Sequence, residues 1–316
     1  VISDGDIRRT IINNGSLEGD IDGCINRSPL FLVEGKYNNE DAKRLMLQNK
    51  IEVIPVLDIK RSVVALLTWD TLFKDEKPIC NQINCSVVIM AGGKGTRLHP
   101  YTKILPKPLI PYGEKSIVEV IMDTFNQYGI EDFYITLNHK GEIVKAYIDS
   151  IDTSYNLRFI TENDFLGTAG GLKCLPGDVS NTFFVSNCDI LVKADYHDIF
   201  KYHCESGNLL TIVGSFQHFI IPYGVIGFTS DGAVSDITEK PEYDFTVNTG
   251  IYVMEKRIMD FIPEGETFHA TDLIKKLLNQ KEKIGIYPVG EKSYVDIGQL
   301  EEYKKIVFNG FGADNG

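Results

Sequence analysis

A run of apolar residues that leads directly into a cluster of glycines limits most strongly what this chain can fold into. Val87–Met90 is typical of a buried strand, and Ala91–Arg97 (AGGKGTR) brings three glycines within four positions. Glycines let backbone N–H groups approach an anion closely, and the guanidinium of Arg97 can bind a phosphate through two hydrogen bonds. The segment therefore predicts a polyphosphate cradle formed by Gly92, Gly93, Lys94, Gly95 and Thr96.

The glycine spacing excludes two common phosphate-binding motifs. A P-loop has Ser or Thr after its Gly-Lys pair, but Lys94 is followed by Gly95. The dinucleotide-binding motif needs a third glycine at a spacing that GGKG does not provide. A plain glycine-rich turn is the alternative, and the preceding strand together with the Pro-Lys-Pro segment at residues 106–108 favours the cradle.

From Cys85 onward, predicted strands alternate with predicted helices. Helices are expected at residues 116–128, with Ser116 and Glu119 as a capping box, at 141–150 and at 194–206. Such alternation predicts an α/β fold with a Rossmann-like, mostly parallel sheet that is covered on both faces and binds ligands at the carboxyl ends of its strands. Asp231-Gly232 lies between two strand-like runs and predicts a hairpin, which suggests an antiparallel sub-sheet added to this core.

The first part of the chain predicts a separate, small α+β unit. We expect a helix from Asp6, a helix at residues 39–49 and a hairpin formed by residues 51–58 and 62–69. The predicted organisation is a unit at residues 1–78, a polar linker at 79–84 and a larger domain at 85–316. Because the chain begins within a pattern already under way, we also expect sequence before Val1.

Composition and charge exclude several classes of function. The formal net charge of −12 disfavours nucleic acid as a partner, since binding to nucleic acid depends on Lys and Arg contacts to phosphates. The longest apolar runs are far shorter than the roughly 20 residues of a membrane-spanning helix. The six cysteines are scattered, which favours reduced thiols and a cytoplasmic location, and the histidines show no metal-ligand spacing and are expected on the surface.

The motifs that follow the glycine segment identify a family. AGGKGTRL and LPKPLIP resemble the signature of the sugar-1-phosphate nucleotidyltransferases, which join a nucleoside triphosphate to a sugar 1-phosphate. The resemblance continues in the family's order through LGTAGGL (166–172), SNCDI (186–190), YGVI (223–226), TEKP (238–241), VNTGIYV (247–253) and YVDIG (294–298). It implies a nucleotide-binding α/β core with a sugar-binding antiparallel sub-sheet.

The resemblance also implies roles for individual residues. Arg97 and the glycine loop would hold the triphosphate, Lys107 would reach the α-phosphate and the attacking phosphate, and Lys240 would bind the sugar phosphate. Gly167, Thr168 and Gly170 would lie beside the base and ribose. The sugar side would be formed by Glu162, Gly224, Glu239, Asn248 and Thr249. Glycine and asparagine are also common turn residues, so a structural role is the alternative at these positions.

Two aspartates predict a metal site. Asp189 follows the buried run TFFVSNC at the end of a strand, and Asp296 lies in YVDIG before a helix. Carboxylates that converge from distant parts of a chain form a hard-oxygen site suited to Mg²⁺. A role in a turn or a helix cap is the alternative for either aspartate.

The N-terminal unit resembles cystathionine beta-synthase (CBS) domains, which bind adenosyl ligands or other nucleotides. Ser3 and Asp6 match positions that contact ribose in that family. A truncated first repeat and a nearly complete second repeat are present, so the unit is expected either to bind a regulatory nucleotide or to serve as a dimerisation module. We expect a homodimer with this region in its interface.

The combined motifs resemble most closely the guanylyltransferases that act on hexosamine or mannose-like 1-phosphates for surface glycans. GTP is therefore the favoured substrate, with UTP, CTP and dTTP as alternatives. Two other classes remain open, a regulatory nucleotide-binding protein without turnover and a pure interaction module. The presence of Arg97, Lys107, Asp189, Lys240 and Asp296 favours the enzyme.

Overall fold

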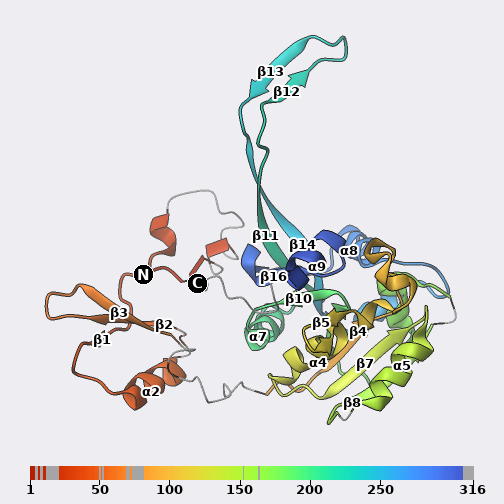
Figure 1. Cartoon of the computed structure of the whole chain (residues 1–316), viewed down its shortest axis with the longest axis horizontal. Coiled ribbons are helices and arrows are strands. Elements are labelled where there is room, and N and C mark those ends of the chain that lie inside the picture. The colour runs from red at the N-terminus through yellow and green to blue at the C-terminus, as the bar shows by residue number, and fades with distance from the viewer. Residues whose placement is uncertain are drawn as a thin grey trace. The chain divides into compact units, whose positions relative to one another are not determined.

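The computed structural model divides the chain into two units, Val1–Cys80 and Asn81–Gly316 (Figure 1). It describes residues 1–3, 6–7, 10–11, 21–49, 51, 53–68, 72, 82–151, 153–162 and 164–308. The helix expected from Asp6 and the linker expected at residues 79–84 lie partly outside these ranges.

The first unit combines one longer helix with a small sheet. The 3₁₀ helix η1 (Ile21–Cys24) and helix α2 (Asn39–Asn49) accompany the strands β1 (Leu32–Val33), β2 (Val53–Leu57) and β3 (Val63–Thr68). β2 runs parallel to β1 and antiparallel to β3. Met46 and Ile54 are fully buried between the helix and the sheet. The predicted helix at residues 39–49 and the predicted hairpin are confirmed, whereas the resemblance to a CBS domain stays a prediction.

The second unit is built on a seven-stranded sheet in the order β15-β11-β14-β9-β4-β7-β8. Its strands are β4 (Ser86–Met90), β7 (Asp132–Leu137), β8 (Asn156–Thr161), β9 (Thr182–Asn187), β11 (Leu210–Ile220), β14 (Glu242–Glu255) and β15 (Ile284–Val289). β4 pairs in parallel with β7 and β9, and β14 runs antiparallel to β9 and β11. The predicted mixed α/β sheet is confirmed.

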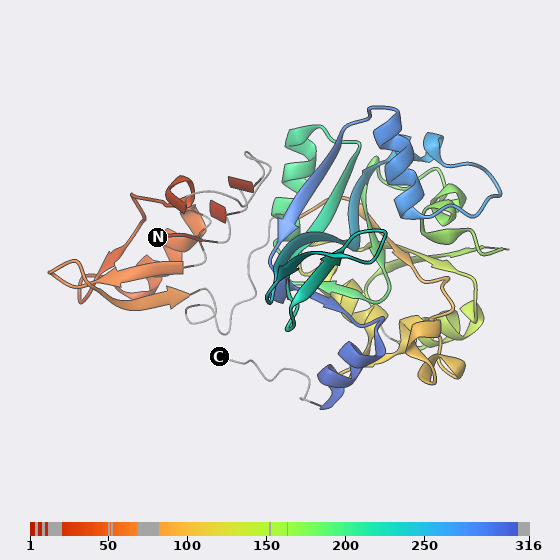
Figure 2. The same ribbon diagram turned by 90° about the horizontal axis from the view of Figure 1, so that it is seen from above.

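Helices cover both faces of this sheet (Figures 1 and 2). They are α4 (Ile117–Asn126), α5 (Gly141–Ser150), the single turn α6 (Gly167–Gly170), α7 (Tyr196–Ser206), α8 (Ala270–Asn279) and α9 (Leu300–Phe308). Val87 and Ile89 of β4 belong to the cluster that includes α4, α5 and α7, whereas Val88 and Met90 belong to the cluster that includes α8. A strand buried on both faces reads as a continuous apolar run, as β4 does.

Short elements at the strand ends shape the loops. The 3₁₀ helices are η2 (Thr96–Leu98), η3 (Tyr101–Lys103), η4 (Lys107–Leu109), η5 (Gly171–Cys174), η6 (Lys256–Phe261) and η7 (Glu291–Ser293). Two small antiparallel pairs join β5 (Pro111–Tyr112) to β6 (Lys115–Ser116), and β10 (Ile190–Val192) to β16 (Tyr294–Asp296). The predicted capping box is confirmed, since Ser116 N and Oγ donate to Glu119 Oε2 over 2.8 and 2.7 Å. None of the described helices is long and apolar enough to span a membrane.

A long ribbon, here named the arm (residues 216–246), extends from the sheet (Figure 1). It consists of the outer halves of β11 and β14, followed by the hairpin of β12 (Val225–Phe228) and β13 (Val234–Thr238). Gly232 has a φ of 85°, so the hairpin predicted from Asp231-Gly232 is confirmed with its glycine in the left-handed region. The pairing of β11 with β14 shifts between Ile212 and Gly214, at the base of the arm.

Candidate active site

A pocket of about 450 Å³ opens where β4 and β9 end. Its lining comes from the turns after these strands, from β14 and β16, and from the start of α8. Among the predicted site residues, those that line it are Gly92, Gly93, Arg97, Lys107, Glu162, Gly167, Thr168, Asp189, Asn248, Thr249 and Asp296. Segments far apart in sequence thus meet at the carboxyl edge of the sheet, where α/β folds bind their ligands.

The glycine segment forms one wall of the pocket. No atom lies within 4 Å of the position that a Cβ would take at Gly93, so its backbone is open to a ligand. Gly95 has a φ of 64°, and a Cβ there would lie 2.9 Å from Thr102 Cγ2 and 3.1 Å from Lys107 Cβ. Lys94, Gly95 and Thr96 do not line the pocket. Gly95 instead packs the turn against the segment that carries Lys107.

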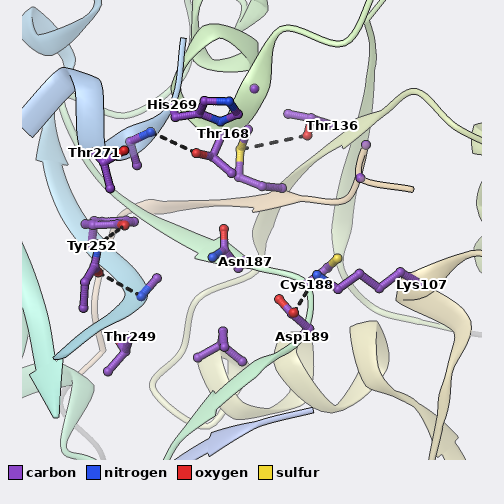
Figure 3. Close-up of a pocket in the computed structure, with 18 of the residues that line it drawn as sticks. Lys107, Thr136, Thr168, Asn187, Cys188, Asp189, Thr249, Tyr252, His269 and Thr271 are labelled. Atoms are coloured by element: carbon purple, nitrogen blue, oxygen red, sulfur yellow. Dashed lines mark hydrogen bonds and ion pairs between the residues drawn. The ribbon is translucent and has the colours of Figure 1, made fainter. Parts of the chain in front are cut away.

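An ion pair lies at the centre of the pocket. Lys107 Nζ is 2.5 Å from Asp189 Oδ2, and Arg97 Nη2 is 3.7 Å from the same oxygen. Figure 3 shows Lys107 pointing toward Asp189. Burial disfavours the charged form of Lys107, but the Cys188 sulfur and the Asp189 carboxylate outweigh it and raise the pKa of Lys107. Asp189 is buried and Arg97 is exposed, so a fixed negative charge lies between one enclosed cation and one accessible cation.

Asp189 and Asp296 converge as predicted from the sequence. The pairing of β10 with β16 places Ile190 opposite Asp296, and Ile297 N donates to Asp189 O over 2.9 Å. A Cβ at Gly298 would lie 1.9 Å from Asp189 Oδ2 and 3.0 Å from Asp296 Oδ1. Both carboxylates therefore face the space beside one glycine, and a side chain there would collide with them.

The donor set of this pair suits Mg²⁺. The described residues contain no group of three or more His, Cys, Asp and Glu side chains placed to hold a metal ion. Mg²⁺ in phosphate-transfer sites is commonly held by one or two carboxylates and completes its shell with water and substrate phosphates. Asp189 and Asp296 fit that pattern, although Lys107 occupies one of the four carboxylate oxygens in this structure.

Glu162, predicted on the sugar side, lies beside the glycine segment. It is 5% exposed, and its Oε1 would be 3.6 Å from a Cβ at Gly92 and 2.4 Å from a Cβ at Gly171. Burial raises the pKa of Glu162, and hydrogen bonds from Leu166 N and Thr136 oppose this shift. The carboxylate thus lies in a narrow, weakly solvated part of the pocket that only glycines at 92 and 171 leave open.

The LGTAG segment joins the pocket to α8. Gly167 has a φ of 78°, and a Cβ there would lie 2.7 Å from Phe268 O, which accepts hydrogen bonds from Ala169 N and Gly170 N. Thr168 Oγ1 accepts from Ala270 N over 2.9 Å, at the start of α8. Gly170 does not line the pocket. Gly167 is thus required by its backbone conformation, and Thr168 is tied to the helix end.

Asn248 and Thr249 line the pocket and also hold a bend in β14. Asn248 Oδ1 accepts from Gly250 N over 3.0 Å, and Asn248 Nδ2 donates to the Tyr252 hydroxyl over 2.8 Å. The buried Thr249 donates from Oγ1 to Val213 O over 2.8 Å. A structural role therefore accounts for part of what these two turn-forming residues do.

Gly224, Glu239 and Lys240 lie on the arm and do not line the pocket. Gly224 contacts Glu239, since a Cβ at Gly224 would be 2.9 Å from Glu239 Oε2. Lys240 has a φ of 46°, and its backbone N–H donates to Tyr223 O over 3.3 Å. A role for these residues in binding the sugar phosphate consequently depends on the position of the arm.

In the first unit, Ser3 and Asp6 bind each other. Ser3 Oγ donates to Asp6 Oδ2 over 2.7 Å, and Ser3 N donates to the same oxygen over 2.9 Å. This is the hydrogen-bond pattern of a helix N-cap. The predicted role of these two residues in binding ribose stays a prediction.

Sequence reasoning missed several residues of the pocket. Asn187 and Tyr294 line it two residues before Asp189 and Asp296, so the motifs SNCDI and YVDIG contained the signal. Burial, followed by the charges of Asp296 and Asp189, raises the pKa of Tyr294 to about 12. The predicted surface role is wrong for His203, which is buried between α7 and the sheet. His269 is exposed as predicted but also lines the pocket (Figure 3). Its position follows from the docking of α8 beside Gly167, which no local pattern reveals.

Comparison with known proteins adds an independent observation. Residues 86–308 match the family model described as nucleotidyl transferase. A UTP–glucose-1-phosphate uridylyltransferase from Synechocystis sp. is 30% identical over 237 residues, which cover 68% of this chain and 61% of that protein. Mannose-1-phosphate guanyltransferase 2 from Candida glabrata is 28% identical over 228 residues, which cover 68% of this chain and 62% of that protein. The chain thus spans about three fifths of the length of these relatives.

Solved structures agree with the fold. HddC from Yersinia pseudotuberculosis matches with a TM-score of 0.56 at 26% identity, over 71% of this chain and 99% of HddC. A second structure of HddC is a complex with GMP-PN.

Proposed function

Because the chain belongs to the nucleotidyl transferase family, we propose that it transfers a nucleoside monophosphate from a nucleoside triphosphate to a sugar 1-phosphate. An oxygen of the sugar phosphate forms a bond to the α-phosphorus while the bond from that phosphorus to the β-phosphate oxygen breaks, which releases pyrophosphate. The arrangement that carries the proposal is Asp189 between Lys107 and Arg97, in one pocket with Asp296 and the glycine segment.

The residues of the chain supply positioning and charge. Two anions must approach each other, and negative charge grows on the leaving pyrophosphate, so fixed cations lower the barrier. The exposed Arg97 binds the triphosphate at the mouth of the glycine segment. Lys107 exchanges its contact with Asp189 for phosphate oxygens. Mg²⁺ held by Asp189 and Asp296 would supply further neutralisation of phosphate charge.

The position of Glu162 favours GTP. Guanine presents two neighbouring donors, N1–H and the N2 amino group, which match the two oxygens of a carboxylate. Uracil and thymine present a single N–H, and cytosine presents one amino group beside ring acceptors. A buried carboxylate beside the glycine segment therefore favours guanine, because guanine donates to both carboxylate oxygens and the other bases donate to one.

The sugar and the wider role are proposed from the resemblance. A mannose-like or hexosamine 1-phosphate is the favoured acceptor, and the nucleotide sugar would supply surface glycan synthesis. UTP, CTP and dTTP remain as alternative donors, and the relative from Synechocystis is a uridylyltransferase. Because nucleoside triphosphates are cytoplasmic metabolites, we place the reaction in the cytoplasm. The first unit is proposed to bind a regulatory nucleotide.

Release of pyrophosphate tests this function. The full chain is mixed with Mg²⁺, each of the four triphosphates and each of mannose, glucose and glucosamine 1-phosphate. We expect release with GTP, and none from the Asp189→Asn variant measured beside it. If GTP binds to the pocket but no pair of substrates yields pyrophosphate, the chain is instead the regulatory nucleotide-binding protein considered above.

A further inference from the structure

The arm leaves the sheet without a third strand to support it. β15 pairs with β11 only as far as Ser215, and among the described strands the remainder of β11 pairs with β14 alone. β12 and β13 likewise pair only with each other within the described residues. A two-stranded ribbon is marginally stable in water unless a further surface packs against it.

On the inner part of the arm, three aromatic side chains gather on one face. Paired residues of antiparallel strands share a face, and Phe219 pairs with Tyr243 while Phe245 follows on the same side. The rings of Phe219 and Tyr243 lie 6.2 and 6.1 Å from that of Phe245. His218 Nδ1 and Asp244 Oδ1, 2.8 Å apart, occupy the opposite face. The other face also carries Phe216 and Ile220. The aromatic face is therefore free of charge, and among the described strands no third strand pairs with the ribbon.

The outer hairpin repeats this pattern. Ile226 pairs with Ile237 and Phe228 pairs with Val234, so the four side chains share one face. They are 54%, 65%, 74% and 70% exposed in that order. Gly227 and Asp236 pair on the opposite face.

The exposed apolar area of these two faces, taken together, approaches the area that one partner buries in a protein interface. The seven side chains are 40–74% exposed, and at roughly 100 Å² each they present on the order of 700 Å². A stable protein interface buries about 800 Å² on each partner, so the arm carries nearly the whole contribution of one subunit.

We propose that the apolar faces of the arm pack against the arm of a second copy of this chain. Two identical faces have the same area and the same polarity, so each suits the other. A two-fold axis brings them together with the same surface of each chain. The arm carries no charge on these faces, which disfavours a polar or nucleic-acid partner. Ile220 and Tyr223 are further exposed apolar residues of the arm. Outside the arm, the exposed apolar residues of the second unit are spread over η3 and the turn after it, α5, the loop before α6, α8 and β15, for example Ile143 and Leu278.

Sedimentation of the full chain tests this proposal. We expect the wild type to be a dimer, and the Phe228→Ser, Ile237→Ser double variant to have a dissociation constant at least about 100-fold higher, because each dimer loses four apolar side chains. Leu278→Ser on α8 is the matched control, since Leu278 is 59% exposed, and it should leave the dimer intact. Circular dichroism establishes that each variant is folded.

A second pair of substitutions, Phe219→Gln with Phe245→Gln, tests the inner face in the same assay and should also weaken the dimer. A monomeric wild type overturns the proposal. A dimer that survives both double variants also overturns it, and it would favour the N-terminal unit as the interface. The measurement involves no turnover, so its outcome is independent of the proposed reaction.

Discussion

The Asp189 carboxylate has two cationic partners in the pocket. It contacts Lys107 and Arg97 and lies beside Gly298, next to Asp296. Without substrate, this anion neutralises cations that would otherwise repel each other in a partly buried space. In the proposed reaction, a triphosphate would bind by exchange of partners, since its oxygens would replace Asp189 Oδ2 beside the two cations.

Arg97→Ala should reduce turnover by about 100-fold or more. The guanidinium offsets charge that grows in the transition state, and loss of one such donor costs roughly 3–4 kcal/mol. The fold should be unaffected because Arg97 is 64% exposed. Pyrophosphate release measures the effect, and Arg257→Ala, at an arginine paired with Glu282 outside the pocket, is the control. Near-normal turnover of the first variant would remove Arg97 from the mechanism.

Asp189→Asn and Asp296→Asn should each raise the Mg²⁺ concentration needed for half-maximal activity. An amide retains one oxygen but loses the negative charge that binds the cation, and a chelator should abolish wild-type turnover. A titration of activity with Mg²⁺ measures both variants beside Asp178→Asn, which alters a surface ion pair with Arg158. Turnover of the wild type in excess chelator would contradict the metal assignment.

Glu162→Gln should weaken GTP binding by roughly 10- to 100-fold while changing UTP binding little. The wild type should also show a pH dependence: burial raises the pKa of Glu162 above 4.5, so the ionised form is lost, and GTP affinity falls, at a higher pH than for an exposed carboxylate. Calorimetric titration over a range of pH measures both effects. Equal losses for GTP and UTP would show that Glu162 does not read the base.

The sequence motifs located pocket residues best where a residue type suited to the chemistry lies at the end of a strand. Asp189 and Asp296 were predicted to form one site, and the pairing of β10 with β16, outside the seven-stranded sheet, brings them together. The placement of Glu162 on the sugar side did not foresee its contact with the glycine segment, because that contact depends on the absence of a side chain at Gly171. Distances of a few ångströms between loops are set by packing and not by spacing in the sequence.

Among the elements, α7 is fastened to the sheet by a buried histidine. His203 Nδ1 lies 2.8 Å from Thr211 Oγ1 on β11, and His203 Nε2 lies 3.1 Å from Glu255 Oε1 on β14. Thr182 Oγ1 on β9 donates to the same carboxylate oxygen over 2.6 Å. The network joins one helix to three strands at the end of the sheet opposite the pocket.

The free energy of unfolding should fall as the pH drops below about 6.5, the unperturbed pKa of His203. Burial lowers the pKa of His203 in the folded state, and the Glu255 carboxylate opposes this only in part. The unfolded chain therefore binds the proton more tightly than the folded chain. The contribution of neutral His203 to the free energy of unfolding is complete above the pKa of the unfolded state, and it is lost as the pH falls toward the pKa of the folded state. Urea unfolding on both sides of pH 6.5 measures it.

His203→Gln should remove that slope, whereas His197→Gln on the same helix should retain it. An unchanged slope in the His203 variant would assign the pH dependence to other groups.

Periodicity predicted most of the elements because each helix of the core buries one face and each inner strand buries two. The helix at residues 141–150 follows directly from this pattern. The capping box follows from the three-residue spacing of Ser116 and Glu119. The arm was predicted as a hairpin but not as a projection. The arm begins where β15 stops pairing with β11, at Ser215. Because β15 lies more than 60 residues further along the chain, no local sequence pattern marks this point.

At the scale of the whole molecule, the division at Cys80 predicts independent behaviour of the two units. A chain shortened to residues 81–316 should fold and retain pyrophosphate release, because the seven-stranded sheet, its helices and every residue that lines the pocket belong to the second unit. Circular dichroism and the release assay on both chains measure this. A folded but inactive short chain would show that the first unit takes part in catalysis.

The turn at Asp231-Gly232 also makes the protein a candidate for splitting into two separately produced fragments. A break at this exposed tip would leave β11 and Asp189 on one fragment and β14 and Asp296 on the other. Neither fragment would hold both carboxylates, but the two strands are central in a shared sheet and could reassemble it. Restored activity would then report that the fragments had met, which is the property required of a split reporter.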